Sequence, residues 1–304
     1  MINGKTLILR FSSMGDVVMT IPIIRCLEKK YPKNKFIFVT RPKFKSFFHE
    51  FKNVEIFELD LINRHKGIFG LFRLFSDLKK LNPRRIADLH SVLRTNILSF
   101  LFKIFLKKVS VLDKKRKERK ALIRKSNKIF KPLTPVHYLY QEVFNKLGFS
   151  IDLTKDHFFP PSKILKINTK NIDIGSGKII GIAPFAKHSP KMYPLDLMQK
   201  IVSYIQDRHT VFLFGYGKLE METVNRWSSV FKNVYSFDKL GGLDNEIALI
   251  SNLDLMISMD SANGHISSIY NVPVITLWGL THPYAGFTTF NSDPNNQFCV
   301  NRDQ

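Results

Sequence analysis

The sequence is poor in the features that mark a secreted or membrane-spanning protein. Its 304 residues include only two cysteines, Cys26 and Cys299, which are far apart and form neither a disulfide nor a metal-binding pattern. The longest apolar stretch, residues 96–106, is interrupted by Lys103 and is too short to span a bilayer. A strand-like run begins almost at once, so we expect no signal peptide. We therefore expect a soluble, cytoplasmic protein, and the few cysteines fit that reducing compartment.

Several catalytic motifs are absent as well. The sequence has no GxxxxGKS or GxxxxGKT phosphate loop, which disfavours a P-loop nucleotidase, and no GxSxG elbow. It also lacks an Asp-x-Asp pair and any cluster of His, Cys and Glu at metal-ligand spacing. If the protein binds a diphosphate, backbone N–H groups and lysines must balance its charge. We accordingly expect no metal ion and no cofactor.

Negative charge is also scarce. The chain has 47 Lys and Arg against 25 Asp and Glu, a net charge of +22. Residues 103–131 alone hold thirteen basic and two acidic residues. Such a block attracts polyanions such as nucleic acid, anionic lipid headgroups or a phosphorylated glycolipid, but it is equally compatible with a solvated insertion. No RNP, KH or helix-turn-helix signature accompanies it, so we expect no nucleic-acid partner, while a non-catalytic polyanion-binding protein stays open as an alternative.

Strand-like and helical patterns alternate along the chain, which predicts parallel sheets with helices on both faces. In the first half the expected strands are 6–11, 35–40, 54–59, 85–89 and 108–112, and the expected helices are 17–30, 69–81, 92–105 and 136–147. In the second half they are strands 178–183, 210–215, 233–237, 254–259 and 273–278, and helices 195–206, 219–231 and 243–251. A Pro- and Gly-rich linker at about 156–178 separates them. We predict two doubly wound α/β domains, 1–160 and 178–304, that face each other across a cleft.

A short turn, Ser12-Ser13-Met14-Gly15-Asp16, follows the first predicted strand. Gly15 allows a tight turn or the close approach of a ligand. Asp16 therefore lies at the carboxyl end of a strand, where open α/β sheets bind ligands, and is a plausible general base. The alternative is a helix cap, since Ser and Asp favour first turns.

A second turn, 259–265, follows an apolar strand and opens a short helix. Free N–H groups at that helix start, with the positive end of the dipole, suit a pyrophosphate. Asp260 could accept hydrogen bonds from sugar hydroxyls, and His265 could donate one to a phosphate. The alternative is an ordinary strand-turn-helix in which Asp260 or Ser261 caps the helix.

Two further loops are predicted at the carboxyl ends of strands in the second half of the chain. Lys187 and Lys191 follow the first strand of the second half and could neutralise phosphate charge, or could be surface lysines. After the next strand, Gly215-Tyr216-Gly217 is followed by Glu220 and Glu222. A carboxylate there could hold ribose hydroxyls, although a solvated helix face explains these glutamates as well.

Together these motifs resemble the ADP-heptose:lipopolysaccharide heptosyltransferases, which form glycosyltransferase family 9 and have the GT-B fold of two Rossmann-like domains. The resemblance runs from about residue 6 to 287. The segments that carry it are Leu7 to Val18 with Pro22, Asp88-Leu89-His90 with Arg94, Lys191-Met192-Tyr193-Pro194, and Asp260 to His265 with Pro273 to Gly279. One departure is the stretch 185–190, where the family often has Thr or Ser that contact phosphate. GT-B proteins also usually close with a helix that crosses back to the first domain, and none is predicted before Gln304.

The resemblance implies a metal-independent, inverting sugar transfer from an ADP-sugar to an inner-core acceptor such as Kdo-lipid A, at the cytoplasmic face of the inner membrane. A different nucleotide sugar is the alternative donor. Asp16 would be the catalytic base in an acceptor-binding first domain, and Lys191 would stabilise the leaving diphosphate in a donor-binding second domain. The implied donor-binding residues are Lys187, Glu220, Glu222, Leu240, Asp260, Ser261, Ala262, Asn263, Gly264 and His265. The implied acceptor-binding residues are Ser13, Met14, Gly15, His90 and Arg94, with the basic block 103–131 meeting the anionic acceptor.

Overall fold

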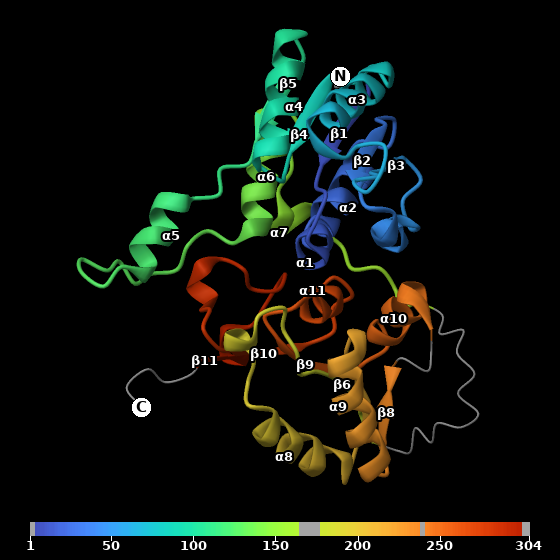
Figure 1. Ribbon diagram of the computed structural model, residues 1–304, viewed down its shortest axis with the longest axis vertical. Coiled ribbons are helices and arrows are strands. Elements are labelled where there is room, and N and C mark those ends of the chain that lie inside the picture. Colours follow the sequence, from blue (N-terminus) through green and yellow to red (C-terminus); the bar gives the residue numbers. More distant parts are fainter. Residues whose placement is uncertain (1–3, 164–176, 238–240, 300–304) are drawn as a thin grey trace. The chain divides into compact units, whose positions relative to one another are not determined.

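The computed structural model describes residues 4–163, 177–237 and 241–299 (Figure 1). The chain forms two compact units, Met1–Phe158 and Phe159–Gln304, which we call the N-terminal and C-terminal units. Much of the predicted linker, residues 164–176, lies outside the described residues. Each unit is built around its own sheet, so each is described by itself.

The N-terminal unit has a five-stranded parallel sheet in the order β3-β2-β1-β4-β5. Its strands are β1 Thr6–Leu9, β2 Phe36–Thr40, β3 Val54–Glu58, β4 Arg85–Asp88 and β5 Lys108–Val111. Its helices are α1 Met14–Val18, α2 Ile21–Lys30, α3 Gly67–Lys80, α4 Leu93–Ile104, α5 Arg116–Ile123, α6 Val136–Lys146 and α7 Leu153–Asp156, with a 3₁₀ helix, η1, at Pro42–Phe48. The order places β1 at the centre, because the chain first builds outward to β3 and then returns to add β4 and β5.

Helices cover both faces of this sheet. α3 and α4 pack on one face through Leu71 and Leu98, against a core that includes Leu7 and other strand residues. On the other face, Phe36 of β2 and Phe144 of α6 both pack against Phe149. Because β1 and β2 are buried along their whole length, they carry near-continuous apolar runs rather than an alternating pattern.

The C-terminal unit repeats this plan with a six-stranded parallel sheet in the order β11-β10-β9-β6-β7-β8. Its strands are β6 Ile179–Ala183, β7 Thr210–Leu213, β8 Val234–Ser236, β9 Leu255–Met259, β10 Val274–Trp278 and β11 Gln297–Cys299. Its helices are α8 Leu195–Gln206, α9 Gly217–Val230, α10 Gly242–Ile250 and α11 Ala262–Ser268, with 3₁₀ turns η3 Ser189–Lys191, η5 Pro283–Ala285 and η6 Pro294–Asn296. α8 and α9 pack on one face of the sheet through Val202 and Trp227.

The structure confirms the predicted α/β alternation and departs from it in several places, of which three concern the sheets and the longer helices. The single helix expected over 17–30 is two helices, α1 and α2, because Pro22 has no N–H to donate and suits the first turn of a new helix. The basic block 103–131, in which a strand was expected at 108–112, also contains the helix α5. A short strand that the sequence did not predict, β11, extends the second sheet.

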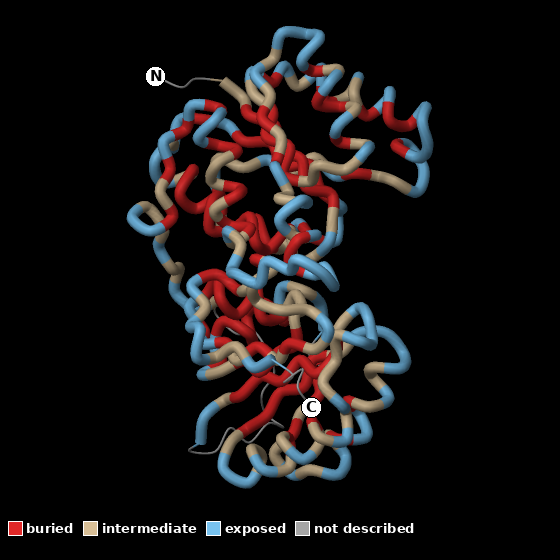
Figure 2. The backbone as a smooth tube through the Cα atoms, turned by 90° about the vertical axis from the view of Figure 1, so that its left-hand side faces the viewer, coloured by how far each residue is buried: buried red, intermediate tan, exposed pale blue. Residues whose placement is uncertain are grey.

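Buried residues run along both sheets and the inner sides of the helices (Figure 2). The largest fully buried side chains include Tyr140 in the N-terminal unit and Trp227 in the C-terminal unit, so each unit has a core of its own. Within the described ranges, none of the helices has both the length and the apolar character needed to cross a membrane.

Candidate functional site

Both sheets have a topological switch point, where the strand order reverses and ligands commonly bind. In the N-terminal unit it lies between β1 and β4, and in the C-terminal unit between β6 and β9. Asp16 and His90 follow the first pair of strands, and Lys191 and Asp260 follow the second. The sheet order therefore places four of the predicted site residues at the two switch points.

In the N-terminal unit, Asp16 is bound from three directions. The Ser13 backbone N–H and hydroxyl donate to Asp16 Oδ2 at 3.1 and 2.7 Å, which makes Asp16 the reciprocal partner of a capping box at the start of α1. Arg10 Nη2 lies 2.6 Å from the same oxygen, while Arg10 Nη1 donates to the Leu89 carbonyl at 2.7 Å. The Asp16 side chain is 25 % exposed and that of Arg10 only 6 %. The cap interpretation is thus correct for Asp16, yet a buried guanidinium also holds its carboxylate at the surface.

This environment sets the charge of the carboxylate. Burial raises the pKa of Asp16, but the charge of Arg10 and the hydrogen bonds from Ser13 outweigh it, so the net pKa lies below the usual value. Asp16 is therefore ionised at neutral pH and can accept a proton from a hydroxyl that is losing it in a transition state.

Three residues that the sequence analysis did not single out interact with Asp16, one by a hydrogen bond and two through their charge. The Tyr140 hydroxyl of α6 donates to the Asp16 carbonyl at 3.5 Å. Burial lowers the pKa of Lys114, as do Arg10 and Arg116, whereas Asp16 raises it. Burial likewise lowers the pKa of Arg119 in α5, while the charge of Asp16 raises it. Charges of the basic block, on Lys114 and Arg119, thus interact electrostatically with Asp16, which no local motif could indicate.

The β4–α4 loop carries the other predicted acceptor residues. The His90 ring meets Phe11 edge-on at 5.3 Å, and burial, followed by the charge of Arg10, lowers the pKa of His90 to about 4, so the ring is neutral at pH 7. Arg94 Nη1 donates to the His65 carbonyl at 2.9 Å, a contact within the unit that ties α4 to the turn before α3. In the Asp16 turn Ser13 is exposed, whereas Met14 and Gly15 are half-buried. His90 and the turn lie at the switch point, while Arg94 is engaged by backbone.

In the C-terminal unit, Lys191 and Asp260 form an ion pair across the switch point. Lys191 Nζ lies 2.6 Å from Asp260 Oδ2, and the Thr281 hydroxyl donates to that oxygen at 3.2 Å. Here the carboxylate is nearly buried, at 9 % exposure, and the ammonium is 27 % exposed. The exposed group of this pair is therefore the positively charged ammonium of Lys191, and its counter-ion, Asp260, is nearly buried.

Close packing fixes the loop that carries Lys191. The Leu280 N–H donates to the Pro190 carbonyl at 2.9 Å. A Cβ on Gly279 would lie 2.8 Å from the carbonyl oxygens of Pro190 and Lys191, so only glycine allows this approach. Beside the loop is a cavity of about 110 Å³; its lining residues are Met192, Tyr193, Pro194, Met259, Leu277, Trp278, Gly279, Phe298 and Cys299.

The 259–265 turn is tied to a buried carboxylate that the sequence analysis missed. Asn263 Nδ2 donates to Glu246 Oε1 at 2.8 Å, and the Tyr216 hydroxyl donates to the same oxygen. Burial raises the pKa of Glu246 to about 7, against the lowering effect of the Asn263 hydrogen bond. The signal in the sequence was an acidic residue inside the apolar helix 243–251. Glu246 of α10 thereby links Tyr216, at the start of α9, to Asn263 of α11.

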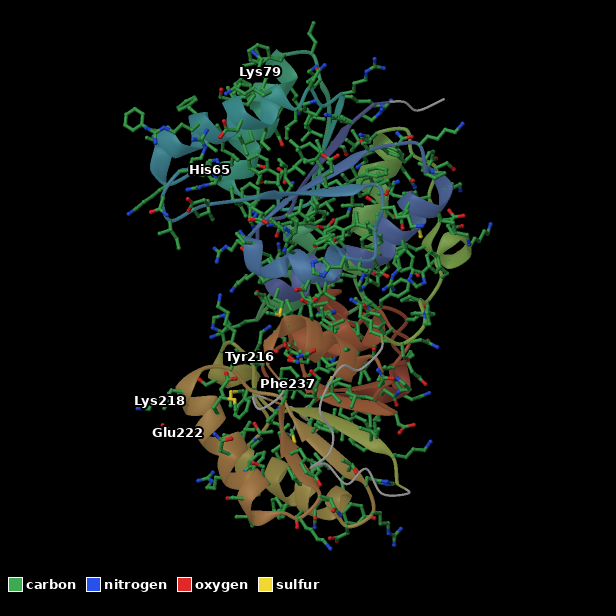
Figure 3. All side chains as sticks on the ribbon, turned by 90° about the vertical axis from the view of Figure 1, so that its right-hand side faces the viewer. His65, Lys79, Tyr216, Lys218, Glu222 and Phe237 are labelled. Carbon is green, nitrogen blue, oxygen red and sulfur yellow. The ribbon has the colours of Figure 1, made fainter. Side chains whose placement is uncertain are left out.

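The remaining predicted donor residues differ in their surroundings. Ser261 Oγ lies 2.9 Å from Ser258 Oγ, Ala262 is half-buried, and Gly264 and His265 are buried in α11. Glu220 Oε2 accepts from the Tyr216 N–H at 2.8 Å, so it caps the start of α9. Glu222 and Lys187 are exposed; Figure 3 shows Glu222 with Lys218 on α9. Leu240 lies outside the described residues.

The described residues hold no group of three or more His, Cys, Asp or Glu that could bind a metal ion. Around the two switch points the chemistry available is thus a carboxylate held by arginine and an ammonium held by aspartate. Such groups can move a proton and balance an anion without forming a metal site.

Comparison with known proteins identifies the family. The family model for glycosyltransferase family 9 (heptosyltransferase) matches residues 72–303. Lipooligosaccharide heptosyltransferase 2 of Campylobacter jejuni is 26% identical over 278 residues, which cover 88% of this chain and 78% of the relative. Two structures of Escherichia coli heptosyltransferase WaaC, one with ADP and one with ADP-2-deoxy-2-fluoro heptose, give TM-scores of 0.70 and 0.67 at 18% identity, covering 97% of this chain and 92% of WaaC.

These structural matches confirm the GT-B fold, with one parallel α/β sheet in each unit. The family match covers most of the chain and begins after the Asp16 turn, so the assignment does not depend on that motif. The chain therefore belongs to glycosyltransferase family 9, the heptosyltransferases, and is a glycosyltransferase.

Proposed function

We propose that this protein transfers a heptose, or a closely similar sugar, from an ADP-sugar to an inner-core lipopolysaccharide acceptor of the Kdo-lipid A type. The name of the Campylobacter relative and the ligands of the two WaaC structures support this substrate pair. Membership of an enzyme family speaks against the alternative of a non-catalytic polyanion-binding protein. Part of the proposal is that the enzyme works without a metal ion, at the cytoplasmic face of the inner membrane.

The observation that carries the proposal is the opposite polarity of the two ion pairs. At one switch point the buried partner is Arg10 and the exposed one is the Asp16 carboxylate. At the other the buried partner is Asp260 and the exposed one is the Lys191 ammonium. A carboxylate suits the deprotonation of an acceptor hydroxyl, and an ammonium suits the charge of a diphosphate, so together they match a transfer that needs both.

In the proposed reaction, Asp16 takes the proton from the acceptor hydroxyl as that oxygen bonds to the anomeric carbon. The bond from this carbon to the diphosphate breaks on the opposite face, which inverts the configuration. ADP leaves with the electron pair of that bond, and Lys191 balances the developing negative charge. No metal is required if Lys191 and Lys187, with backbone N–H groups at residues 261–264, supply the positive field.

The remaining assignments follow the chemistry of each group. Asp260 would orient both Lys191 and the donor sugar, and His265 would donate to a phosphate. Glu220 and Glu222, near the start of α9, are the candidates for the ribose hydroxyls. The acceptor's anionic groups would meet the turn 13–15, His90, Arg94 and the basic block 103–131, which includes Lys114 and Arg119.

A thermal-shift panel of nucleotide sugars tests the donor assignment. We expect ADP and ADP-heptose to raise the melting temperature in the presence of EDTA, because a ligand at about 100 times its Kd adds roughly 2.7 kcal/mol to the folded state. UDP-N-acetylglucosamine is the matched control for the base and the sugar. Stabilisation by the UDP-sugar alone would transfer the proposal to another donor, and stabilisation only with added Mg²⁺ would refute metal independence.

A further inference from the structure

Apolar side chains form a stripe along the outer face of α4. Leu93, Phe100 and Ile104 are 78, 63 and 58 % exposed, and Ile97, which comes between them in the sequence, is half-buried and also packs against the core. Their spacing of four, three and four residues places all of them on one side of a helix. The opposite side of α4 already fills the core through Leu98 and other residues. Both the face of α4 that packs against the core and its solvent-exposed face are therefore apolar.

The neighbouring helix α3 continues this surface. Ile68, Phe69 and Phe72 are 56, 79 and 52 % exposed. α3 and α4 contact each other and cover the same face of the sheet, so their outer sides point away from the sheet in the same direction (Figure 1). We call this combined surface the α3–α4 face. Soluble proteins rarely expose so many large apolar side chains together unless the surface binds something.

Positive charge accompanies the apolar residues. α3 carries Arg73, Lys79 and Lys80, and Figure 3 shows Lys79 on the helix surface. The single acidic residue of the two helices is Asp77, which is only 16 % exposed and is bound by Arg64 at 2.8 Å. The α3–α4 face is thus basic and apolar, without a freely exposed carboxylate.

This charge indicates which partner suits the surface. The N-terminal unit has 34 Lys and Arg against 13 Asp and Glu, a net charge of +21. A second copy of the chain on this face would bring like charges together. An anionic bilayer attracts the basic side chains and accepts the apolar ones at the level of its headgroups.

We propose that the α3–α4 face docks on an anionic lipid bilayer. Phe69, Phe100 and Ile104 enter the interfacial region, and Arg73 and Lys80 bind lipid phosphates. The contact is peripheral and reversible, since it rests on a few side chains and on screened charges. It rests on the membrane location in the proposed function and deepens it by naming the surface that makes the contact, but it requires no particular donor or acceptor.

Co-sedimentation of the full chain with vesicles tests the docking. We compare vesicles of phosphatidylcholine alone with vesicles that contain about one third phosphatidylglycerol, a content high enough to attract basic surfaces. The double variant Phe100→Ser, Ile104→Ser should bind the anionic vesicles about tenfold more weakly or worse. Its matched control is Tyr204→Ser, Val230→Ser, which removes two large side chains that are more exposed, at 79 and 65 %, from the C-terminal unit.

A charge variant tests the electrostatic contribution to the proposed membrane binding. Arg73→Ser, Lys80→Ser should weaken binding to anionic vesicles and reduce its salt dependence, while melting temperatures stay unchanged because both side chains are exposed. Equal binding to neutral and anionic vesicles, or equal binding by the apolar variant and its control, would overturn the proposal. So would a dimer of the wild-type chain that dissociates in the apolar variant, because the α3–α4 face would then be a self-association surface.

The thermal shift by ADP-heptose separates this inference from the proposed function. The apolar variant should keep the wild-type shift while losing vesicle binding. A wild-type chain that binds anionic vesicles but shows no shift with any ADP-sugar would refute the donor assignment and leave the docking intact. The converse result would refute the docking alone.

Discussion

The two units share a fold and a position for their charged residues, but they reverse the roles of the charges. Each holds an ion pair of 2.6 Å at its switch point, with the carboxylate outermost in the N-terminal unit and the ammonium outermost in the C-terminal unit. The buried partner in each case positions the exposed one, and in the N-terminal unit the charge of Arg10 also lowers the pKa of Asp16. One architecture can therefore supply either a proton acceptor or an anion site, depending on which partner the packing buries.

The units differ as strongly in net charge. The N-terminal unit has a net charge of +21, whereas the C-terminal unit, with 13 basic and 12 acidic residues, has +1. A unit that binds a small donor needs only a local positive site such as Lys191. If the N-terminal unit meets an anionic glycolipid and a bilayer, as we propose, it benefits from a broad positive field, which acts over about a Debye length of 8–10 Å.

The largest effect should come from removing the exposed carboxylate. Asp16→Asn keeps the size of the side chain but removes its charge, and we expect kcat to fall by about 10³-fold or more, since general-base catalysis contributes roughly 10²–10⁴-fold. The donor-induced thermal shift should persist, because the proposed donor-binding residues lie in the C-terminal unit.

The matched control for this variant is Ser13→Ala, which removes one hydrogen bond to Asp16 and leaves the carboxylate and Arg10 in place. Its kcat should fall by less than about tenfold, in keeping with a single hydrogen bond. Comparable losses in the two variants would mean that Asp16 acts only as a helix cap.

The second effect tests the C-terminal pair. Lys191→Met removes the exposed ammonium, so we expect the ADP shift to vanish and kcat/KM to fall by about 10²-fold, the scale of one electrostatic contact in a transition state. It also leaves Asp260 nearly buried without its counter-ion, which should destabilise the C-terminal unit by about 2 kcal/mol.

The double variant Lys191→Met, Asp260→Asn distinguishes these two losses. Neutralising both partners should restore most of the stability, because no unpaired charge remains, but should not restore turnover. Recovery of activity together with stability would show that Lys191 has only a structural role.

A smaller effect is expected where glycine lets two loops touch. In Gly279→Ala the new Cβ would displace the backbone of Pro190 and Lys191, and we expect kcat/KM to fall by about tenfold with the fold intact, because small displacements of a positioned group are costly. Gly264→Ala is the graded control, since its Cβ would meet the Ser258 hydroxyl at 3.3 Å and that side chain can move. A larger loss in the control would locate the sensitive contact in α11 instead.

The sequence predicted most of the fold because its apolar runs and turns are local signals. It also predicted the loops that hold Asp16, Lys191 and Asp260, since each follows a strand. It could not predict that Lys191 pairs with Asp260, because that contact depends on β6 and β9 lying side by side.

The same limit explains the residues that were missed. In the sequence, Arg10 is only a residue at the end of a predicted strand. The adjacency of β1 and β4 brings its side chain to the Leu89 carbonyl. Arg119 is, in the sequence, only one of many basic residues in the block 103–131. Glu246 becomes notable only when Tyr216 and Asn263 arrive from two other loops. Local patterns thus indicate which loops matter, and tertiary contacts decide which side chains act together.

Glu246 offers the smallest but most specific test within the C-terminal unit. Its pKa of about 7 in the folded state lies above the value of 4.5 usual for glutamate, so folding favours its protonated form. This contribution to stability is complete below pH 4.5 and is lost as the pH rises through 7. Glu246→Gln retains an oxygen that accepts from Tyr216 and Asn263 but cannot ionise. We expect the stability of the wild type relative to this variant to decline by about 3 kcal/mol between pH 4.5 and 8.

Urea unfolding followed by tryptophan fluorescence measures this in the intact chain. Both tryptophans, Trp227 and Trp278, are buried in the C-terminal unit, so the signal reports on that unit alone. Glu222→Gln, at an exposed position on α9, is the control and should leave the pH dependence unchanged. If Glu246→Gln and the wild type showed parallel pH profiles, Glu246 would be ionised in the folded protein. Its hydrogen bonds to Tyr216 and Asn263 would then stabilise a buried negative charge close to a proposed diphosphate site, an arrangement that disfavours anion binding there.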